Sequence, residues 1–424
     1  MEREVGIARY GTTTPGIGGR IKAVPEDFVV EEIPADLPLV ADGRFLVTRV
    51  TVRNWETHRL VRQLARRLGV SRHRISFAGT KDKRAVTTQR MTFEGLDEEV
   101  VSAVHLKDVT VEPLHRSSRK LSLGDLTGNR FRIRLREIEV PEDEVGARLR
   151  SLSKELEEGG GFPNYFGIQR FGEIRPLSHR LGRALVRGNL ERAVSLYVGE
   201  TFPREDPETL RARAAFRDTG DVDRALKEFP LHLSFERSLL HHLKERPGDY
   251  GGALLRFPHS LLTLFVNAYQ SFLFNRILSL RMDEGLSLSE PILGDLLLPL
   301  DKRGLPDRRR PIAVTEANRA KTALQVRAGK AWVSGLLAGY DVPRAEGEMG
   351  RLEDQVIEEE EVHLADFHVP SLPKLSSRGL RRVLVAPIRD FAFAVDGDVR
   401  LTFTLNPGCY ATSLLRELRK GDTL

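Results

Sequence analysis

The sequence predicts an α+β fold, with a mostly antiparallel sheet and a helix-rich middle section. Three observations support this prediction. Apolar and polar residues alternate in residues 126–138 and again in residues 381–405, as they do in half-buried strands. Between about residues 180 and 285 the apolar residues recur at helical spacing instead. The chain has 424 residues, of which 40% are hydrophobic, so it can bury more than one core.

The N-terminal elements can be placed in order along the chain. RIKAV (20–24) is strand-like, Pro25 interrupts it, and the following run DFVVEEI alternates as a second strand does. From Thr57 onward leucines recur every four residues with arginines on the other faces, and Gly69 stands where a helix C-cap belongs. An amphipathic helix with a basic outer surface is therefore expected. The short apolar segment RISFA and the alternating TTQRMTF (87–93) then predict two strands joined by a loop.

That loop, within FAGTKDKRAVTTQ (77–89), places a single carboxylate, Asp82, between Lys81 and Lys83. Glycine followed by lysines suggests a phosphate-binding loop, but a P-loop needs a second glycine and then Lys-Ser/Thr, and Gly79 has no such partner. Two interpretations remain. Asp82 is either a catalytic group on a loop held by a rigid sheet or a turn residue paired with a neighbouring lysine.

Positive charge is concentrated in this part of the chain. The net charge is +6, yet residues 53–90 contain eleven Lys or Arg against two acids, which leaves −3 for the remainder. Such a concentration is typical of proteins that bind a nucleic-acid backbone, and a solvated arginine-rich helix face is the alternative. In residues 126–138 apolar residues form one strand face and arginines the other. The arginine face fits a surface that binds RNA. The alternative is a solvent-exposed strand whose charges prevent pairing with other chains.

The segment GGGFPNYFGIQRFGE (159–173) combines glycines, aromatic rings and amides. Glycines let the backbone approach a ligand, and aromatic rings such as that of Phe166 offer a face on which a base can stack. An amide such as that of Asn164 can orient a carboxylate or read a base edge. The alternative is a loop that its aromatic side chains fold onto the core.

The middle of the chain is expected to form a core of its own. It contains the long apolar helix HSLLTLFVNAYQSFLFNRILSLRMDEG, strands and turns in PILGDLLLPL and AVTEANRAKTALQ, and an acidic helix at residues 352–367. Strand alternation returns only at residue 381. We therefore expect residues 185–376 to be a domain inserted into a catalytic domain made of residues 1–184 and 377–424.

Several protein classes are disfavoured by what the sequence lacks. Cys409 is the only cysteine, so neither an intramolecular disulfide nor a cysteine-ligated zinc site is expected. His241 and His242 are adjacent, about 100° apart on a helix, and so are not a natural metal pair. No apolar run reaches the ~18 residues of a membrane span and no signal peptide is apparent. A cytoplasmic protein without a metal site is expected.

Four segments together resemble the signature segments of the tRNA pseudouridine synthase D (TruD) family, in the archaeal type. They occur in the family's order and span nearly the whole chain: KAVPEDFVVEE, FAGTKDKRAVTTQ, NYFGIQRFG and LNPGCYATSLLREL. The resemblance implies a pseudouridine synthase catalytic fold with an inserted TRUD domain. It also implies a V-shaped two-domain architecture whose cleft holds RNA.

The same resemblance implies roles for individual residues. Asp82 matches the family's essential carboxylate and would be the nucleophile, with Lys22 close to it. Lys81 and Lys83, and a hydrogen bond from Asn164, would favour its charged form. Phe166 would stack on a flipped uracil, as base extrusion requires. Two further candidates lie in the last segment: Tyr410, where relatives commonly have Phe, and Arg416, whose surroundings also fit a plain amphipathic helix.

The expected reaction converts uridine, at position 13 of tRNA, to pseudouridine without any cofactor. The sequence leaves three first steps open: Asp82 attacks ribose C1′, adds to uracil C6 or removes the C2′ proton. A catalytically silent RNA-binding protein of the same fold is the alternative. A metal- or nucleotide-dependent RNA enzyme is disfavoured because the sequence has no P-loop, no dinucleotide fingerprint and no clustered metal ligands. The sequence has no heptad repeat, so a monomer is expected.

Overall fold

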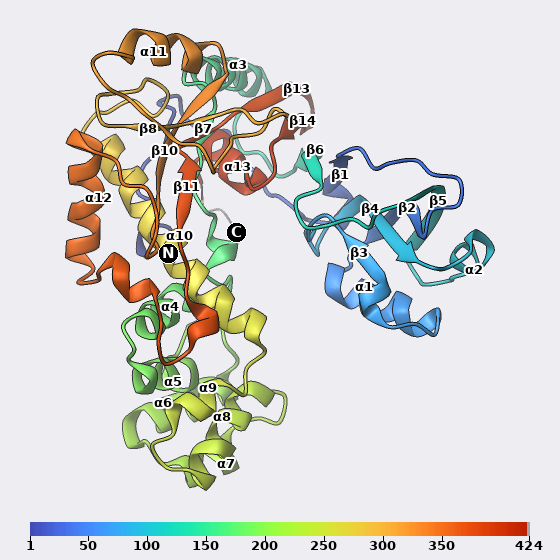
Figure 1. The fold of residues 1–424 in the computed structure, drawn as a ribbon, viewed down its shortest axis with the longest axis vertical. Coiled ribbons are helices and arrows are strands. Elements are labelled where there is room, and N and C mark those ends of the chain that lie inside the picture. Colours follow the sequence, from blue (N-terminus) through green and yellow to red (C-terminus); the bar gives the residue numbers. More distant parts are fainter. Residues whose placement is uncertain (422–424) are drawn as a thin grey trace. The chain divides into compact units, whose positions relative to one another are not determined.

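The computed structural model describes residues 1–421, which divide into two compact units (Figure 1). We call one the sheet unit; it comprises Tyr10–Phe162, Asp301–Leu305 and residues 386–421. We call the other the helical unit; it comprises Met1–Arg9, Pro163–Leu300 and Pro306–Val385. The helical unit contains the expected inserted domain, residues 185–376, except for Asp301–Leu305, and it also contains the first nine residues, residues 163–184 and residues 377–385. The expected domain borders remain a prediction.

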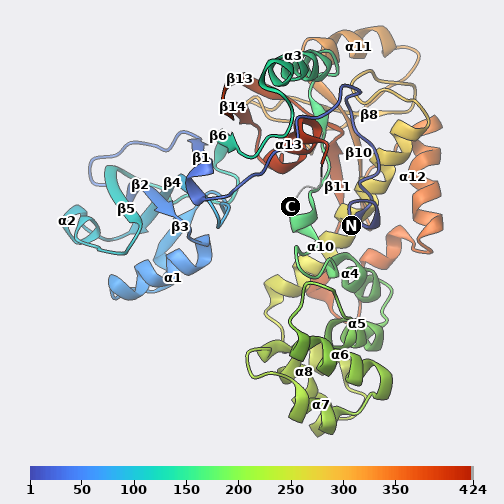
Figure 2. The ribbon, with the colours of Figure 1, turned by 180° about the vertical axis from the view of Figure 1, so that it is seen from behind.

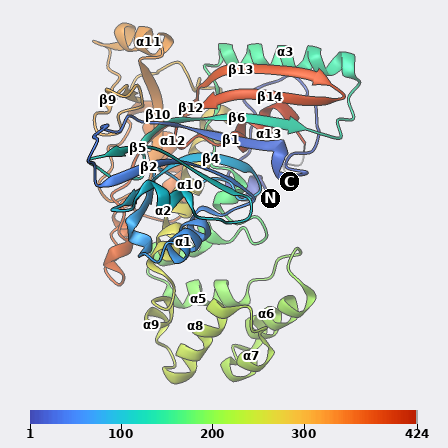
Figure 3. The ribbon, with the colours of Figure 1, turned by 90° about the vertical axis from the view of Figure 1, so that its right-hand side faces the viewer.

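The sheet unit is built on one eight-stranded sheet. Its strand order is β13-β14-β6-β1-β4-β2-β5, and Figure 3 shows the first four strands side by side. Strand β3 pairs with the second half of β4, beyond the residues of β4 that pair with β1. All of its pairs are antiparallel except β1 with β4, so the predicted α+β class with a mostly antiparallel sheet is confirmed. The strands are β1 (Phe28–Pro34), β2 (Phe45–Arg53), β3 (Ile75–Phe77), β4 (Val86–Glu94), β5 (Val109–Ser117), β6 (Leu126–Leu135), β13 (Ile388–Asp396) and β14 (Asp398–Leu405).

Two large apolar clusters pack helices against this sheet. One joins β1, β6 and β14 to α3 (Glu142–Glu158) and α13 (Ala411–Arg419), and in it Val30, Phe131 and Phe403 lie in register across three strands. The other joins β2 and β4 to α1 (Thr57–Arg67). A short helix, α2 (Glu98–Ser102), completes the unit.

The predicted alternation of β6 is confirmed. Phe131, Ile133 and Leu135 are buried, whereas Arg130, Arg132 and Arg134 are exposed. Side chains in a strand point alternately to its two faces, so a strand with this pattern is buried on one face and solvated on the other.

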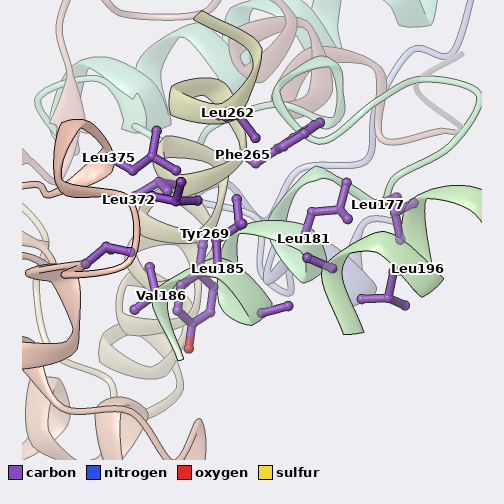
Figure 4. Packing of buried hydrophobic residues seen from close by; sticks show 14 of the residues in the cluster. Leu177, Leu181, Leu185, Val186, Leu196, Leu262, Phe265, Tyr269, Leu372 and Leu375 are labelled. Atoms are coloured by element: carbon purple, nitrogen blue, oxygen red, sulfur yellow. The ribbon is translucent and has the colours of Figure 1, made fainter. Parts of the chain in front are cut away.

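The helical unit packs around α10 (His259–Asp283), the long apolar helix expected from the sequence. Figure 2 shows α10 from behind, and Figure 4 shows Leu262, Phe265 and Tyr269 of this helix against Leu181 and Leu185 of α4. Its helices are α4 (Ser178–Val186), α5 (Leu190–Gly199), α6 (Pro207–Thr219), α7 (Val222–Glu228), α8 (Ser234–Glu245), α9 (Tyr250–Leu254), α10, α11 (Arg319–Arg327) and α12 (Gly347–Glu359).

A second, four-stranded sheet belongs to the helical unit, with the order β11-β10-β8-β9. Every pair in it is antiparallel. Its strands are β8 (Leu296–Pro299), β9 (Ile312–Ala313), β10 (Ala331–Leu337) and β11 (Leu380–Val383), and the short strands β7 (Phe162–Pro163) and β12 (Val385–Ala386) lie at the unit borders.

Three local predictions were wrong. The segment RIKAV is not a strand but an irregular turn, because only Arg20 bridges to Arg136 and Lys22 has a left-handed φ of 53°. Residues 319–327 form helix α11 rather than a strand or turn, in keeping with the Ala, Leu, Arg, Lys and Gln of this segment, which are good helix formers. The acidic helix begins at Gly347 and ends at Glu359, before a separate short 3-10 turn at Leu364–Phe367.

Candidate active site

Asp82 lies on the loop between β3 and β4, as the sequence predicts. Neighbouring elements hold this loop by its backbone. The N–H of Lys81 donates to the Thr57 hydroxyl, at the first residue of α1, over 3.0 Å. The N–H of Asn54, just after β2, donates to the Ala85 carbonyl over 2.9 Å. The loop that carries the carboxylate is therefore fixed on both sides of Asp82.

The partner of Asp82 is Lys22. The Nζ atom of Lys22 lies 2.6 Å from Oδ1 of Asp82, and the Asp82 side chain is 31% exposed. The same Nζ lies 4.1 Å from the centre of the Phe28 ring, a cation–π distance. The Arg84 guanidinium adds a second link between the two segments, because it donates to the Ala23 carbonyl over 2.8 Å. The predicted proximity of Lys22 to Asp82 thus holds in the structure, and the carboxylate remains open to solvent.

The turn that carries Lys22 is anchored through Arg136. The backbones of Arg20 and Arg136 exchange two hydrogen bonds, and the Arg136 guanidinium binds both oxygens of the buried Asp27 at 2.8–3.0 Å. Burial alone would raise the pKa of Asp27, but the hydrogen bonds from Arg136 and from the Val24 N–H outweigh it and lower that pKa. Asp27 therefore stays ionised and holds the turn in place.

Lys81 does not face Asp82 but a second acid, Glu32. Lys81 Nζ lies 2.6 Å from Glu32 Oε2, and both side chains are almost fully buried, at 5% and 1% exposure. The other Glu32 oxygen accepts the Arg90 N–H over 3.1 Å. Sequence reasoning missed Glu32. The signal was present, because Glu32 continues the buried face of β1 formed by Phe28 and Val30, where an acid needs a partner.

Asn164 and Phe166 belong to the helical unit, where both are buried. The Asn164 amide nitrogen donates to the Val383 carbonyl over 2.9 Å, and its oxygen accepts from Arg382 over 2.5 Å. The Arg382 guanidinium also lies over the Phe166 ring, 4.0 Å from its centre. Sequence reasoning did not single out Arg382, which joins the two predicted residues. The bond from Asn164 to Asp82 and the stacking of Phe166 on a base remain predictions.

Tyr410 and Arg416 belong to the sheet unit. Tyr410 is the N-cap residue of α13. Arg416 is 4% exposed, and its guanidinium lies 3.8 Å from the centre of the Tyr10 ring. The next residue, Glu417, accepts hydrogen bonds from the backbone of Gly11 and from Thr12. Arg416 thus packs against the N-terminal segment, and its predicted role in the site remains a prediction.

Residues 1–421 contain neither a cluster of metal ligands nor a membrane-spanning helix. No three His, Cys, Asp or Glu side chains are grouped so that they could hold a metal ion. No helix in this range has both the length and the apolar character needed to cross a membrane.

Comparison with known proteins places this chain and its fold in a class of enzymes. The crystal structure of a Methanosarcina mazei protein, whose title names it as a candidate tRNA pseudouridine synthase D (TruD), superimposes with a TM-score of 0.87 at 39% identity, covering 99% of this chain and 98% of that one. The fold is that of an RNA pseudouridine synthase, an isomerase. The family model for tRNA pseudouridine synthase D (TruD) matches residues 4–418. The chain belongs to this family, which confirms the resemblance seen in the sequence.

Relatives extend over the whole chain. A Methanococcoides burtonii protein named as a probable tRNA pseudouridine synthase D is 41% identical, covering 100% of this chain and 98% of its own. A Pyrococcus furiosus protein of the same name is 40% identical, covering 99% of this chain and 100% of its own. These archaeal relatives agree with the archaeal type expected from the sequence.

Proposed function

We propose that this protein isomerises a uridine of tRNA to pseudouridine, with Asp82 as the nucleophile. The observation that carries the proposal is the Lys22–Asp82 pair, a partly exposed carboxylate held 2.6 Å from an ammonium on a loop fixed by its neighbours. Family membership supplies the reaction class, and the names of the relatives supply tRNA as the substrate.

The reaction breaks the bond between ribose C1′ and uracil N1 and forms a bond between C1′ and C5. N1 gains a proton and C5 loses one, so no electrons are exchanged with a second reactant. A carboxylate can begin this sequence by attack on C1′, by addition to C6 or by removal of the C2′ proton. In each case the ionised form of Asp82 is the reactive one. The Lys22 ammonium donates a hydrogen bond to Oδ1 of Asp82 over 2.6 Å and so holds the carboxylate in place.

The remaining assignments belong to the same proposal. Lys22 and Lys81 support the site, the second through Glu32 rather than directly. Asn164, Phe166, Tyr410 and Arg416 bind or orient the flipped uridine and the bases around it. The target is uridine 13 of tRNA, the residues 1–184 and 377–424 form the catalytic domain, and the enzyme acts as a cytoplasmic monomer without metal or cofactor.

Tritium release tests the proposal. Unmodified tRNA transcripts carrying uridine labelled at C5 are incubated with the wild type and with Asp82→Asn. Substitution at C5 expels the label to water, so the wild type releases tritium and the variant releases none. Transcripts that lack only uridine 13 then locate the target.

Asp42→Asn is the matched control, because Asp42 is an exposed loop aspartate of the same unit. It should release tritium at the wild-type rate. A folded wild type that binds tRNA but releases no tritium from any transcript contradicts the proposal, and leaves the alternative of a catalytically silent RNA-binding protein. That alternative also predicts equal tRNA affinity for wild type and Asp82→Asn.

A further inference from the structure

We infer that the outer face of helix α1 binds the RNA backbone next to the target uridine. This inference rests on the proposed function and adds a binding surface to it. The surface consists of Arg59, Arg62 and Arg66, which we call the α1 arginine row. These residues are spaced three and four apart, so they lie on one side of the helix.

The row is exposed because the opposite side of α1 is buried. Leu60, Val61, Leu64 and Ala65 pack on β2 and β4 in the second core of the sheet unit. The three arginines of the row are exposed. From Arg59 to Arg66, seven residue steps along the helix, the row extends about 10 Å, roughly the length of three nucleotides of a helical strand at about 3.4 Å each.

The charge of the row is not balanced within the part of the chain that the structure describes. None of its three arginines forms an ion pair with a carboxylate of residues 1–421. The nearby Glu56 is the N-cap of α1 and accepts the backbone N–H groups of His58 and Arg59. By contrast, many other arginines of the same unit pair with Asp or Glu, among them Arg44, Arg49, Arg53, Arg116, Arg119 and Arg134.

Like charges three or four residues apart destabilise a helix, so the row weakens α1 in the free protein. A polyanion would reverse this effect, because phosphates neutralise the arginines and release their own counterions. Arginine also binds phosphate oxygens through two donors at once, which lysine does not. An RNA strand is therefore the partner whose chemistry fits the row.

The row is continuous with the candidate active site. The first residue of α1, Thr57, accepts the backbone N–H of Lys81, the residue before Asp82. Lys83 and Arg84, on the other side of Asp82, are exposed as well. A strand held by the row thus passes beside the loop that carries the nucleophile, which suits the nucleotides that flank the reacting uridine.

The test compares the triple variant Arg59→Gln, Arg62→Gln, Arg66→Gln with the wild type. The dissociation constant for the tRNA transcript is measured over a series of salt concentrations, and kcat and KM by tritium release. If each arginine contacts a phosphate, the slope of log affinity against log salt falls by about 2 to 3. KM should rise at least tenfold, and kcat should fall by much less.

Two control sets keep the result specific. Arg44→Gln, Arg49→Gln, Arg119→Gln changes the net charge equally at arginines that already have carboxylate partners, and should leave the salt slope nearly unchanged. Substituting lysine for the three arginines of the row keeps the charge, and should keep most of the slope. Thermal unfolding of the glutamine set should occur at or slightly above the wild-type temperature, since the replaced side chains are exposed and their mutual repulsion is removed.

The inference is overturned if the glutamine set binds tRNA with the wild-type slope, if the control set loses as much, or if the wild type does not bind tRNA. Failure of the proposed function gives a different result. In that case the wild type releases no tritium, yet its tRNA affinity still depends on the row.

Discussion

The backbone of Lys22 is the least expected feature at the residue scale. Its φ of 53° is in the left-handed region, which a long side chain adopts at a cost of about 1–3 kcal/mol. Arg136 holds the turn from two directions, through the Arg20 backbone and through Asp27. In this conformation the Lys22 ammonium reaches Asp82. The free-energy cost of the left-handed backbone therefore accompanies the placement of the Lys22 charge beside the carboxylate.

Replacing Lys22 with methionine removes this charge and keeps the length of the side chain. We expect the single-turnover rate of pseudouridine formation at saturating tRNA to fall by roughly 10- to 100-fold, because the carboxylate loses its counter-charge and its fixed position. The affinity for tRNA should change by much less.

Lys120→Met is the matched control, since Lys120 is an exposed lysine of the same unit. A Lys22→Met enzyme that turns over at the wild-type rate would show that the ion pair has no part in the reaction. An equal loss in affinity and rate would point to substrate binding instead.

At the scale of elements, strand β1 and the loop before β4 are joined by the Glu32–Lys81 pair. Buried ion pairs contribute little net stability, but removing one partner leaves a buried charge unpaired. We therefore expect Glu32→Gln to lower the free energy of unfolding by about 3–5 kcal/mol. The double variant Glu32→Gln, Lys81→Met should recover a large part of that loss.

Chemical denaturation of the four proteins of this cycle measures the coupling. If Glu32 also positions the loop, the double variant regains stability without regaining the wild-type kcat. Additive effects of the two substitutions on stability would contradict the pairing.

The N-terminal segment is held on α3 by Glu155, whose carboxylate accepts hydrogen bonds from the backbone and hydroxyl groups of Thr13 and Thr14. Burial alone would raise the pKa of Glu155, but these hydrogen bonds outweigh it and lower the pKa from 4.5 to about 2. A carboxyl whose pKa is lower in the folded state stabilises the fold above its unfolded pKa, and this contribution is lost as the pH falls from 4.5 towards 2.

Glu155→Gln should accordingly be less stable than the wild type at pH 7, by about 1 kcal/mol, and the difference should shrink as the pH falls below 4.5. Denaturation curves at pH 7, 5, 4 and 3 test this, with the exposed Glu157→Gln as the control. A stability difference that stays constant over this range would argue against the role of these hydrogen bonds.

At the scale of the whole molecule, the proposed reaction needs only protein groups and RNA. We expect treatment of the enzyme with EDTA to leave the rate of tritium release unchanged, provided that the RNA is folded under the assay conditions. The measurement uses enzyme treated with EDTA and then dialysed, assayed with and without added Mg²⁺ at a fixed total ionic strength. A loss of turnover that Zn²⁺ or Mn²⁺ restores, with tRNA binding intact, would contradict the cofactor-free mechanism.

Much of this protein could be predicted from its sequence because the decisive signals are local. Alternation identified β4, β6 and β14, helical spacing identified α1 and α10, and the loop position of Asp82 followed from the strands on either side. The family resemblance added Lys22 as the neighbour of Asp82. These conclusions depend on residues close together in the chain or on motifs whose order is visible in it.

The tertiary structure decided which charged groups meet. Lys81 adjoins Asp82 in sequence yet pairs with Glu32, because a buried acid on β1 requires a cation. Arg382, far along the chain, joins Asn164 and Phe166. Pairings between distant segments depend on strand register and burial, which local patterns leave open, whereas the alternation and helical spacing of each segment are already present in its own residues.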